Sequence, residues 1–210
     1  MSRWLYMFER RALWESRRRW AIGLLAVYLV LYWLDGAIYR LLYVGRAGDG
    51  ARLREVFELR SWAAMLKTAG YFPTWVIVAV LFAAAGRLVE GVRIAAGAAV
   101  AGTLAEVLKP LIGQVRPHLV DGVHRYYHVE GLHDLSFGMA SSHAAVAFGA
   151  AWGLLFINRR VGWVALALAA GCGLERMMAG AHFTTDIYVG ALLGYAGARL
   201  FRAGGRTGLP

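Results

Sequence analysis

Charged side chains are scarce in this 210-residue chain, where they make up 17% of the residues, against about 25% in a typical soluble domain. Cysteine is nearly absent, because Cys172 stands alone, so no disulfide can form within the chain. A disulfide scaffold, a collagen-like repeat and a disordered chain are therefore excluded. Apolar residues make up 59% of the chain, and several apolar runs approach the ~20 residues that cross a bilayer. The composition favours an integral membrane protein over a soluble domain.

Lysine is also rare, since Lys67 and Lys109 are the only two among 23 basic residues, yet the net charge is +10. A basic excess of this size can indicate nucleic-acid binding. Here the arginines flank apolar runs, which is typical of membrane orientation and of contact with anionic lipid. We therefore expect membrane lipids as partners and no nucleic acid, and the sequence indicates no obligate protein partner.

The apolar runs predict an all-α integral membrane protein with six transmembrane helices. Residues 1–19 alternate aromatic residues with arginines at helical spacing and have no signal-peptide cleavage site, so we expect an interfacial helix there, with a disordered basic leader as the alternative. An amphipathic helix is expected near 51–68, between the first two spans. The six-span domain covers 20–202 and a tail follows at 203–210, with no second domain. The expected spans are 20–38, 71–88, 94–112, 141–157, 161–176 and 184–201.

The distribution of arginine predicts the orientation of these spans. With a cytoplasmic N-terminus, more than half of the basic residues lie in inner segments, as the positive-inside rule requires. We therefore expect a multi-pass protein of the inner membrane. Two glycine pairs at four-residue spacing, Gly149 with Gly153 and Gly190 with Gly194, are interpreted as faces where helices pack.

Three short segments carry ionisable or hydroxyl side chains at the ends of expected spans, where burial is costly. They cover residues 109–117, 140–143 and 176–186. Two membrane crossings separate the second segment from the third, so all three meet at one face, which the charge distribution places on the periplasmic side. The candidate site residues are Lys109, Arg116, Ser141, Ser142, His143, Arg176, His182 and Asp186.

These residue types together indicate phosphoryl transfer through a histidine nucleophile. Guanidinium groups bind phosphate oxygens in pairs, and serines at the start of an apolar helix cap an N-terminus that favours anions. His182 and Asp186 are four residues apart, so they share a face if they lie on a helix. A carboxylate bonded to one ring nitrogen fixes the tautomer and leaves the other nitrogen free to attack.

The order K-x6-RP, then xSxH, then R-x5-H-x3-D, resembles the type 2 phosphatidic acid phosphatase (PAP2) superfamily, over about residues 105–190. That family includes membrane lipid phosphatases, bacterial acid phosphatases and vanadium haloperoxidases. The resemblance implies that His182 forms a phosphohistidine, that Asp186 orients it, and that His143 protonates the leaving oxygen. It also implies no metal and no cofactor. The implied phosphate-binding residues are Lys109, Arg116, Ser141 and Arg176, to which we add Ser142.

Three positions depart from the family pattern. The family's Pro-Ser-Gly-His is Ala140-Ser141-Ser142-His143 here, and Ser142 either narrows the approach to phosphate or adds a hydroxyl donor. Glu175 replaces a serine, and it repels an anionic substrate unless it is paired with an arginine or turned away. Glu106, one turn before Lys109, is either a structural partner of that lysine or a catalytic group.

The expected activity is that of a membrane phosphatase acting on a lipid phosphate or pyrophosphate at the outer leaflet. The candidate substrates are polyprenyl pyrophosphate, phosphatidylglycerol phosphate, phosphatidic acid and phosphorylated lipid A, and the 51–68 helix is a candidate lid. The alternatives are a lipid-to-lipid phosphotransferase with the same site and a non-catalytic transport or lipid-binding protein. A group of histidines before the second segment is interpreted as surface or head-group contacts rather than a metal site: His118, His124, His128 and His133.

Overall fold

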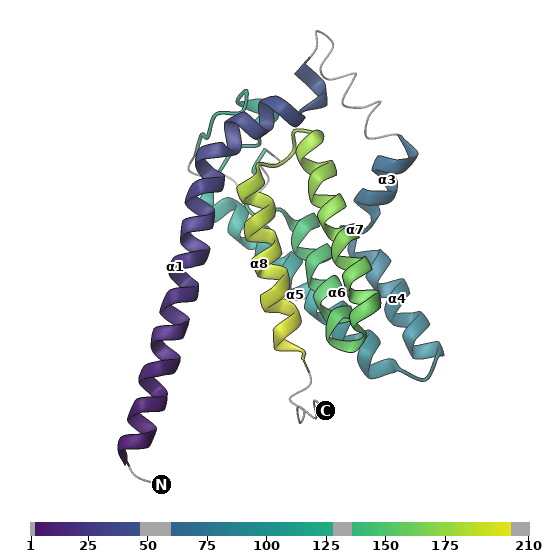
Figure 1. Cartoon of the computed structure of the whole chain (residues 1–210). Coiled ribbons are helices and arrows are strands. Elements are labelled where there is room, and N and C mark those ends of the chain that lie inside the picture. Colours follow the sequence, from purple (N-terminus) through teal and green to yellow (C-terminus); the bar gives the residue numbers. More distant parts are fainter. Residues whose placement is uncertain (1–2, 47–59, 128–135, 203–210) are drawn as a thin grey trace.

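The computed structural model describes residues 3–46, 60–127 and 136–202 (Figure 1). The regular elements of these residues are all helices, and no strand is present among them, although two isolated β-bridges lie between residues 114 and 137. The all-α prediction is therefore confirmed. The elements are α1 (Arg3–Leu42), η1 (Val44–Arg46), α3 (Ser61–Thr68), α4 (Phe72–Ala84), α5 (Leu88–Ile112), η2 (Pro117–Leu119), α6 (Ser142–Ile157), α7 (Arg159–Met178) and α8 (Thr184–Leu200).

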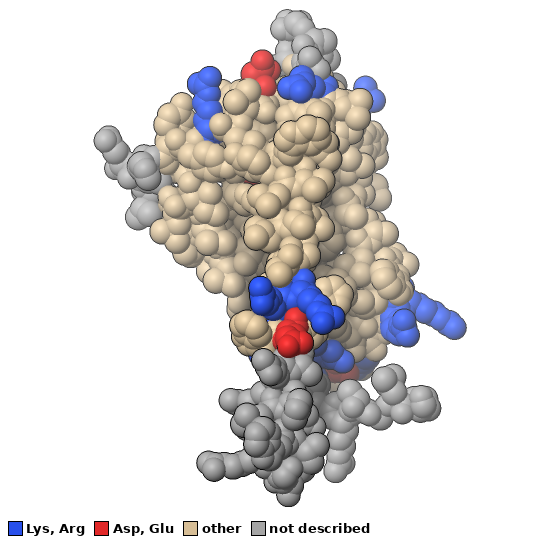
Figure 2. All heavy atoms as spheres, turned by 60° about the vertical axis from the view of Figure 1, so that its left-hand side comes forward, with Lys and Arg blue, Asp and Glu red and all other residues tan. Residues whose placement is uncertain are grey.

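Three described helices are long and apolar enough to cross a membrane: residues Trp14–Leu42 of α1, all of α5 and all of α7. The pair α3 and α4, bent by 65°, would make a fourth span, and α6 is a shorter apolar helix. On the face shown in Figure 2, Lys, Arg, Asp and Glu lie toward the two ends, and the band between them is uncharged. These features are those of a multi-pass membrane protein.

The first helix is longer than the sequence suggested. Residues Arg3–Leu42 form one helix of 40 residues, without a break between the expected interfacial helix and the first span. The reason is local, because arginine has a high helix propensity and no proline or glycine precedes Gly23. Whether residues 1–19 lie on the membrane surface stays a prediction.

The amphipathic helix expected at 51–68 is described only in its second part, α3, because residues 47–59 lie outside the described residues. The chain then bends before α4, where Pro73 occupies the first helical turn, a position that does not require its missing N–H. The indole Nε1 of Trp75 donates to the Ala69 carbonyl at 2.8 Å across the bend.

Small residues bring α5, α6 and α8 into close contact. A Cβ atom placed on Gly194 of α8 would lie 2.7 Å from the backbone nitrogen of Gly149 on α6, and one on Gly197 would lie 2.5 Å from the carbonyl of Gly97 on α5. Such backbone approach is how helices associate where lipid supplies no hydrophobic driving force. The predicted packing role of Gly149, Gly153, Gly190 and Gly194 is confirmed, and Gly97 and Gly197 act in the same way without having been predicted.

The ends of the helices define two opposite ends of the molecule (Figure 1). The N-terminal end of α1 and the C-terminal end of α8 lie at one of them, whereas α1, α5 and α7 finish, and α6 and α8 begin, at the other. The three polar segments of the sequence therefore converge at the end far from residues 3 and 202, where the described chain begins and ends.

Candidate active site

The first polar segment leaves α5 through a turn that requires glycine. Gly113 has a left-handed φ of 68°, and a Cβ there would meet the Tyr127 carbonyl at 2.0 Å. The loop then runs back beside the other segments: the Arg116 amide donates to the Ser136 carbonyl at 2.8 Å, and the His118 amide to the Gly180 carbonyl at 3.1 Å. The first bond holds this segment against the chain that leads to the second segment, and the other holds it against the third.

The second segment starts α6 directly against the start of α8. Ser141 is fully buried and caps α6, since its Oγ accepts from the Ala144 amide at 3.4 Å, as predicted. Its own amide donates to the Asp186 carbonyl at 3.1 Å. A Cβ on Gly190 would lie 2.6 Å from the Ser141 carbonyl, so the two helix starts are in contact.

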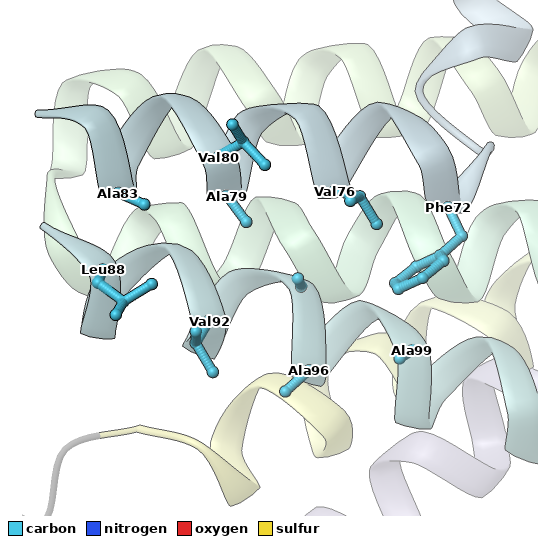
Figure 3. Close-up of a pocket in the computed structure, with 10 residues that line it drawn as sticks. Phe72, Val76, Ala79, Val80, Ala83, Leu88, Val92, Ala96 and Ala99 are labelled. Carbon is cyan, nitrogen blue, oxygen red and sulfur yellow. The ribbon is translucent and has the colours of Figure 1, made fainter.

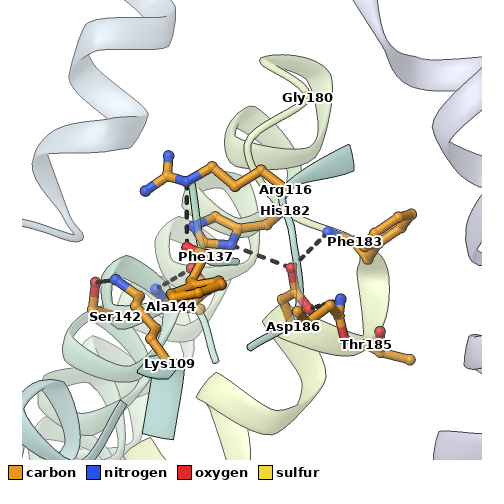
Figure 4. A network of polar contacts seen from close by, with 12 residues as sticks. Lys109, Arg116, Phe137, Ser142, Ala144, Gly180, His182, Phe183, Thr185 and Asp186 are labelled. Carbon is orange, nitrogen blue, oxygen red and sulfur yellow. Dashed lines mark hydrogen bonds and ion pairs between the residues drawn. The ribbon is translucent and has the colours of Figure 1, made fainter. Parts of the chain in front are cut away.

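His182 and Asp186 are paired, but by a different route from the predicted shared helix face. His182 precedes α8 in the loop, and Asp186 lies in the first turn of that helix. The carboxylate turns back toward the loop, where its Oδ2 accepts from the Phe183 amide at 2.9 Å and lies 3.4 Å from Nδ1 of His182 (Figure 4). Gln114 Nε2 donates to the other oxygen, Oδ1, at 2.9 Å. The carboxylate thus holds one side of the imidazole and leaves Nε2 available.

Burial and charge keep His182 in its neutral form. The side chain is 3% exposed. Burial first, and then the positive charges of Arg176, Arg116 and Lys109, lower the pKa of His182 well below its ordinary value. All three predicted cations thus act on the predicted nucleophile, and a neutral imidazole is the form that can attack an electrophile.

Two of the cations already have partners in the protein. Lys109 Nζ lies 2.7 Å from Glu106 Oε1 and donates to Ser142 Oγ at 3.2 Å. Nε of Arg116 donates to the Phe137 carbonyl at 3.3 Å (Figure 4). Glu106 is therefore a partner of Lys109, which is one of the two roles expected for it. The Ser142 hydroxyl accepts a hydrogen bond from the same lysine.

Arg176 has an ion-pair partner too, but it is buried with donors that make no hydrogen bond. The residue is 5% exposed, and its Nε and Nη1 atoms make no hydrogen bond with any described residue. Glu175, fully buried, lies 3.5 Å from Nη1 through its Oε1. Glu175 is thus paired with an arginine, so its negative charge is compensated and need not repel an anionic substrate.

His143 lies in the first turn of α6 beneath the bend between α3 and α4. Its Nε2 atom is buried and makes no hydrogen bond with the described residues. The Tyr71 ring meets the imidazole edge-on at a centroid distance of 5.2 Å. A Cβ on Gly70 would lie 2.7 Å from the His143 Cβ, so this bend packs directly on the histidine.

The sequence interpretation missed Gln114, which bonds to Asp186, and Asp35, a buried carboxylate on α1. A signal existed for Asp35, since an acidic residue inside an expected span is costly and usually functional. Of the loop histidines, His118 contacts the Gly180 carbonyl at 2.9 Å and His124 contacts Asp35 at 3.3 Å. His128 and His133 lie outside the described residues.

The chemistry of this arrangement is that of an anion site. It combines a helix N-terminus, a neutral histidine backed by a carboxylate, a second histidine with an unused buried nitrogen, and three cations. Among the residues that the structure describes, no three His, Cys, Asp or Glu side chains are grouped as a metal site would require. The expectation that no metal or cofactor takes part stays a prediction.

Comparison with known sequences places these residues within one family. The family model for the PAP2 superfamily matches residues 90–206. Lipid A 1-phosphatase of Rhizobium etli is 35% identical over 105 residues, which is 44% of this chain and 40% of that protein. Bacitracin transport permease protein BcrC of Bacillus licheniformis is 30% identical over 66 residues, 31% of this chain and 32% of that protein. The chain thus spans less than half the length of the curated relatives it matches.

Two solved structures have the same fold. LpxE of Aquifex aeolicus superposes with a TM-score of 0.60 at 22% identity, over 80% of this chain and 94% of that one. A transmembrane PAP2-type phosphatidylglycerolphosphate phosphatase from Bacillus subtilis superposes with a TM-score of 0.57 at 23% identity, over 86% of this chain and 92% of that one. The similarity of fold therefore extends beyond the matched segment to α1.

Proposed function

This chain belongs to the PAP2 superfamily, and from that premise we propose that it is a membrane lipid phosphatase. It removes the terminal phosphate from a lipid phosphate or pyrophosphate. The substrate class is that of polyprenyl pyrophosphate, phosphatidylglycerol phosphate, phosphatidic acid or phosphorylated lipid A, and the chain works without metal or cofactor.

The observation that carries the proposal is a set of buried nitrogen atoms that make no hydrogen bond with the described residues, although Nη1 of Arg176 lies 3.5 Å from Glu175 Oε1. Arg176 Nε and Nη1 and His143 Nε2 are all buried, and none forms a hydrogen bond with the described residues. Buried polar groups in native proteins are almost always satisfied, and leaving them unsatisfied is costly. Phosphate oxygens would satisfy all of them, since guanidinium and imidazole are charge-assisted donors to phosphate.

The reaction proceeds in two displacements. Nε2 of His182 attacks phosphorus in line, the N–P bond forms as the P–O bond breaks, and His143 gives its proton to the leaving oxygen. A water molecule then attacks the phosphohistidine, His143 takes its proton, and His182 is released. Asp186 holds Nδ1 throughout, while Lys109, Arg116, Arg176 and the hydroxyls of Ser141 and Ser142 bind the phosphoryl oxygens.

The topology proposed for the chain is six spans in the inner membrane, namely α1, the bent pair α3–α4, and α5 to α8. Both ends of the described chain lie on one side, opposite the site. With those arginine-rich ends in the cytoplasm, the site faces the periplasm and takes its substrate from the outer leaflet.

An apolar groove supports a lipid rather than a soluble substrate. The groove lies between α4 and α5, has a volume of about 360 Å³ and is lined by Phe72, Val76, Ala79, Val80, Val92 and Ala96 (Figure 3). Phe72, at one end of it, follows Tyr71, whose ring contacts the His143 imidazole. A hydrocarbon chain in this groove would place its phosphate next to His143.

The decisive experiment measures phosphate release from a panel of lipid phosphates by the purified protein and by His182→Ala. We expect the wild type to release phosphate in excess EDTA and the variant to lose nearly all activity while it unfolds at an unchanged temperature. Label from a radioactive lipid phosphate should be trapped on His182. Undiminished activity of His182→Ala would contradict the mechanism, and a loss in EDTA that a divalent ion restores would contradict the metal-free claim.

The same assay separates the rival functions. Labelled phosphate that appears on a second lipid, instead of free in solution, would identify a phosphotransferase with the same site. A protein that binds lipid phosphate but never acquires covalent label would be a transport or lipid-binding protein.

A further inference from the structure

The first helix carries one buried carboxylate. Among the described side chains of α1, from Trp14 to Leu42, Asp35 and Tyr39 alone are buried, and Asp35 is 1% exposed. An acid at this depth in a membrane protein is expensive unless donors compensate it. All the donors that the structure shows at Asp35 come from other parts of the chain.

Two of these donors belong to the start of α8. Oδ1 of Asp35 accepts from the Thr185 amide at 3.2 Å, and Oδ2 accepts from the Thr185 hydroxyl at 2.5 Å, across a separation of 150 residues. The residue at the N-cap of α8 is Phe183, whose side chain has no capping group. Asp35 therefore caps the N-terminus of α8 from a distant part of the same chain, and its negative charge faces the positive end of the helix.

The third partner fixes the residue beside His182. His124 Nε2 lies 3.3 Å from Asp35 Oδ2. The His124 ring stacks on Tyr32 of α1 at a centroid distance of 4.1 Å, and it contacts the Phe183 ring at 4.2 Å with a tilt of 31°. Phe183 directly follows the nucleophile, so α1 and the loop after α5 hold both sides of the turn that leads into α8.

The geometry points to Asp35 as a positioning residue of the active site. We propose that its bonds to Thr185 set the first turn of α8, and thereby the place of the next residue, Asp186, which aligns the His182 imidazole. The assignment of a catalytic effect rests on the proposed phosphatase function. A displacement of about 1 Å in a catalytic constellation can lower the rate ~10²-fold, so a loose first turn should slow the chemical step.

Asp35→Asn and Thr185→Val test this proposal, because each is nearly isosteric. We expect each to lower kcat by ~10- to 100-fold, to leave KM within about twofold, since neither residue contacts substrate, and to slow labelling of His182. The double variant should be no slower than the slower single variant, because both changes remove the same contact. Thr185→Ser, which keeps the hydroxyl, should restore kcat.

The matched control is Tyr188→Phe. Tyr188 Oη donates to the Leu24 carbonyl at 3.0 Å, so it also joins α8 to α1, but further along α8 than Thr185 and through a half-buried side chain. We expect its kcat to equal that of the wild type. Equal losses in Tyr188→Phe and Asp35→Asn, unchanged kcat in Thr185→Val, or a loss confined to KM would each overturn the proposal.

Thermal unfolding of the same variants separates this proposal from the proposed function. If Asp35→Asn does not fold, the pair Thr185→Val and Thr185→Ser decides alone. If the wild type releases no phosphate from any lipid, the proposed function has failed. Non-additive unfolding temperatures of the single and double variants would then still support the cap, and additive ones would overturn it.

Discussion

Two parts of the molecule are held together by different physics. Helices α5, α6 and α8 meet through glycine and alanine, with backbone against backbone, as at Gly149 and Gly194. Most described side chains of α1 are exposed, and the helix joins α8 through polar contacts from Asp35 and Tyr188. Within lipid, close packing of small residues and polar bonds are the two available ways to associate helices. The candidate active site lies at the start of α8, where that helix contacts Ser141 of α6 through Gly190 and Asp35 of α1 through Thr185.

The largest difference between the two parts should be catalytic. Arg176→Met removes the buried donors at the end of α7 and should lower kcat/KM by ~10²–10³-fold, the usual cost of one donor to a reacting oxyanion. Arg19→Met makes the same chemical change on an exposed residue of α1 and should leave kcat/KM unchanged. Phosphate release from one lipid substrate compares the two. Similar rates for both variants would mean that Arg176 does not bind the phosphoryl group.

The next difference concerns packing. Gly194→Ala adds one carbon atom that meets the backbone of Gly149 at 2.7 Å, whereas the same change at Gly23 of α1 meets nothing within 4 Å. We expect Gly194→Ala to destabilise the protein by about 1–3 kcal/mol, the usual cost of overpacking. Gly23→Ala should be neutral or slightly stabilising, because alanine favours helix.

Thermal unfolding in one detergent measures both glycine variants. If their unfolding temperatures moved together, the small-residue contact between α6 and α8 would not be what holds the core.

The contrast between the two parts also explains what could be predicted from the sequence. Residues such as His143, His182 and Asp186 could be selected as candidates because polar residues at the ends of apolar spans form a local pattern in the chain. Helix α1 continues without a break through the expected boundary at residue 19, because the change from basic to apolar composition does not require a break in the backbone. The cap by Asp35 could not be predicted, because Thr185 lies 150 residues away in the chain. No repeating sequence pattern links two positions so far apart. The break at residues 69–71 agrees with the boundary expected between the 51–68 helix and the 71–88 span. Its packing on His143 was not predicted, because no local pattern indicates contact with a residue so distant in the chain.

A smaller effect should appear in the pH dependence. Burial and the cations Arg176, Arg116 and Lys109 lower the pKa of His182. The imidazole is therefore still neutral at pH ~6.5, the pH at which a free histidine is half protonated. The acid limb of kcat/KM that reports this histidine should therefore lie below that pH. Arg176→Met removes a positive charge beside the ring, so the pKa should rise and the limb should move to higher pH.

The pH profiles of wild type, Arg176→Met and Arg19→Met, taken with one substrate, test this shift, because the ionisation of the substrate is common to all three. A limb at the same pH in every variant would show that these charges do not act on the nucleophile.

The smallest effect is expected in the groove between α4 and α5. Ala96→Phe fills part of the groove, but a lipid chain displaced from it remains among other lipid chains, which are equally apolar, so only packing contacts are lost. We therefore expect KM for a long-chain lipid phosphate to rise only a few-fold, with kcat unchanged, and KM for a short water-soluble phosphate ester to stay the same. Ala26→Phe, on an exposed position of α1, is the control and should change neither. If Ala96→Phe raised KM for both substrates alike, the groove would influence the site through the fold and not as the seat of the hydrocarbon chain.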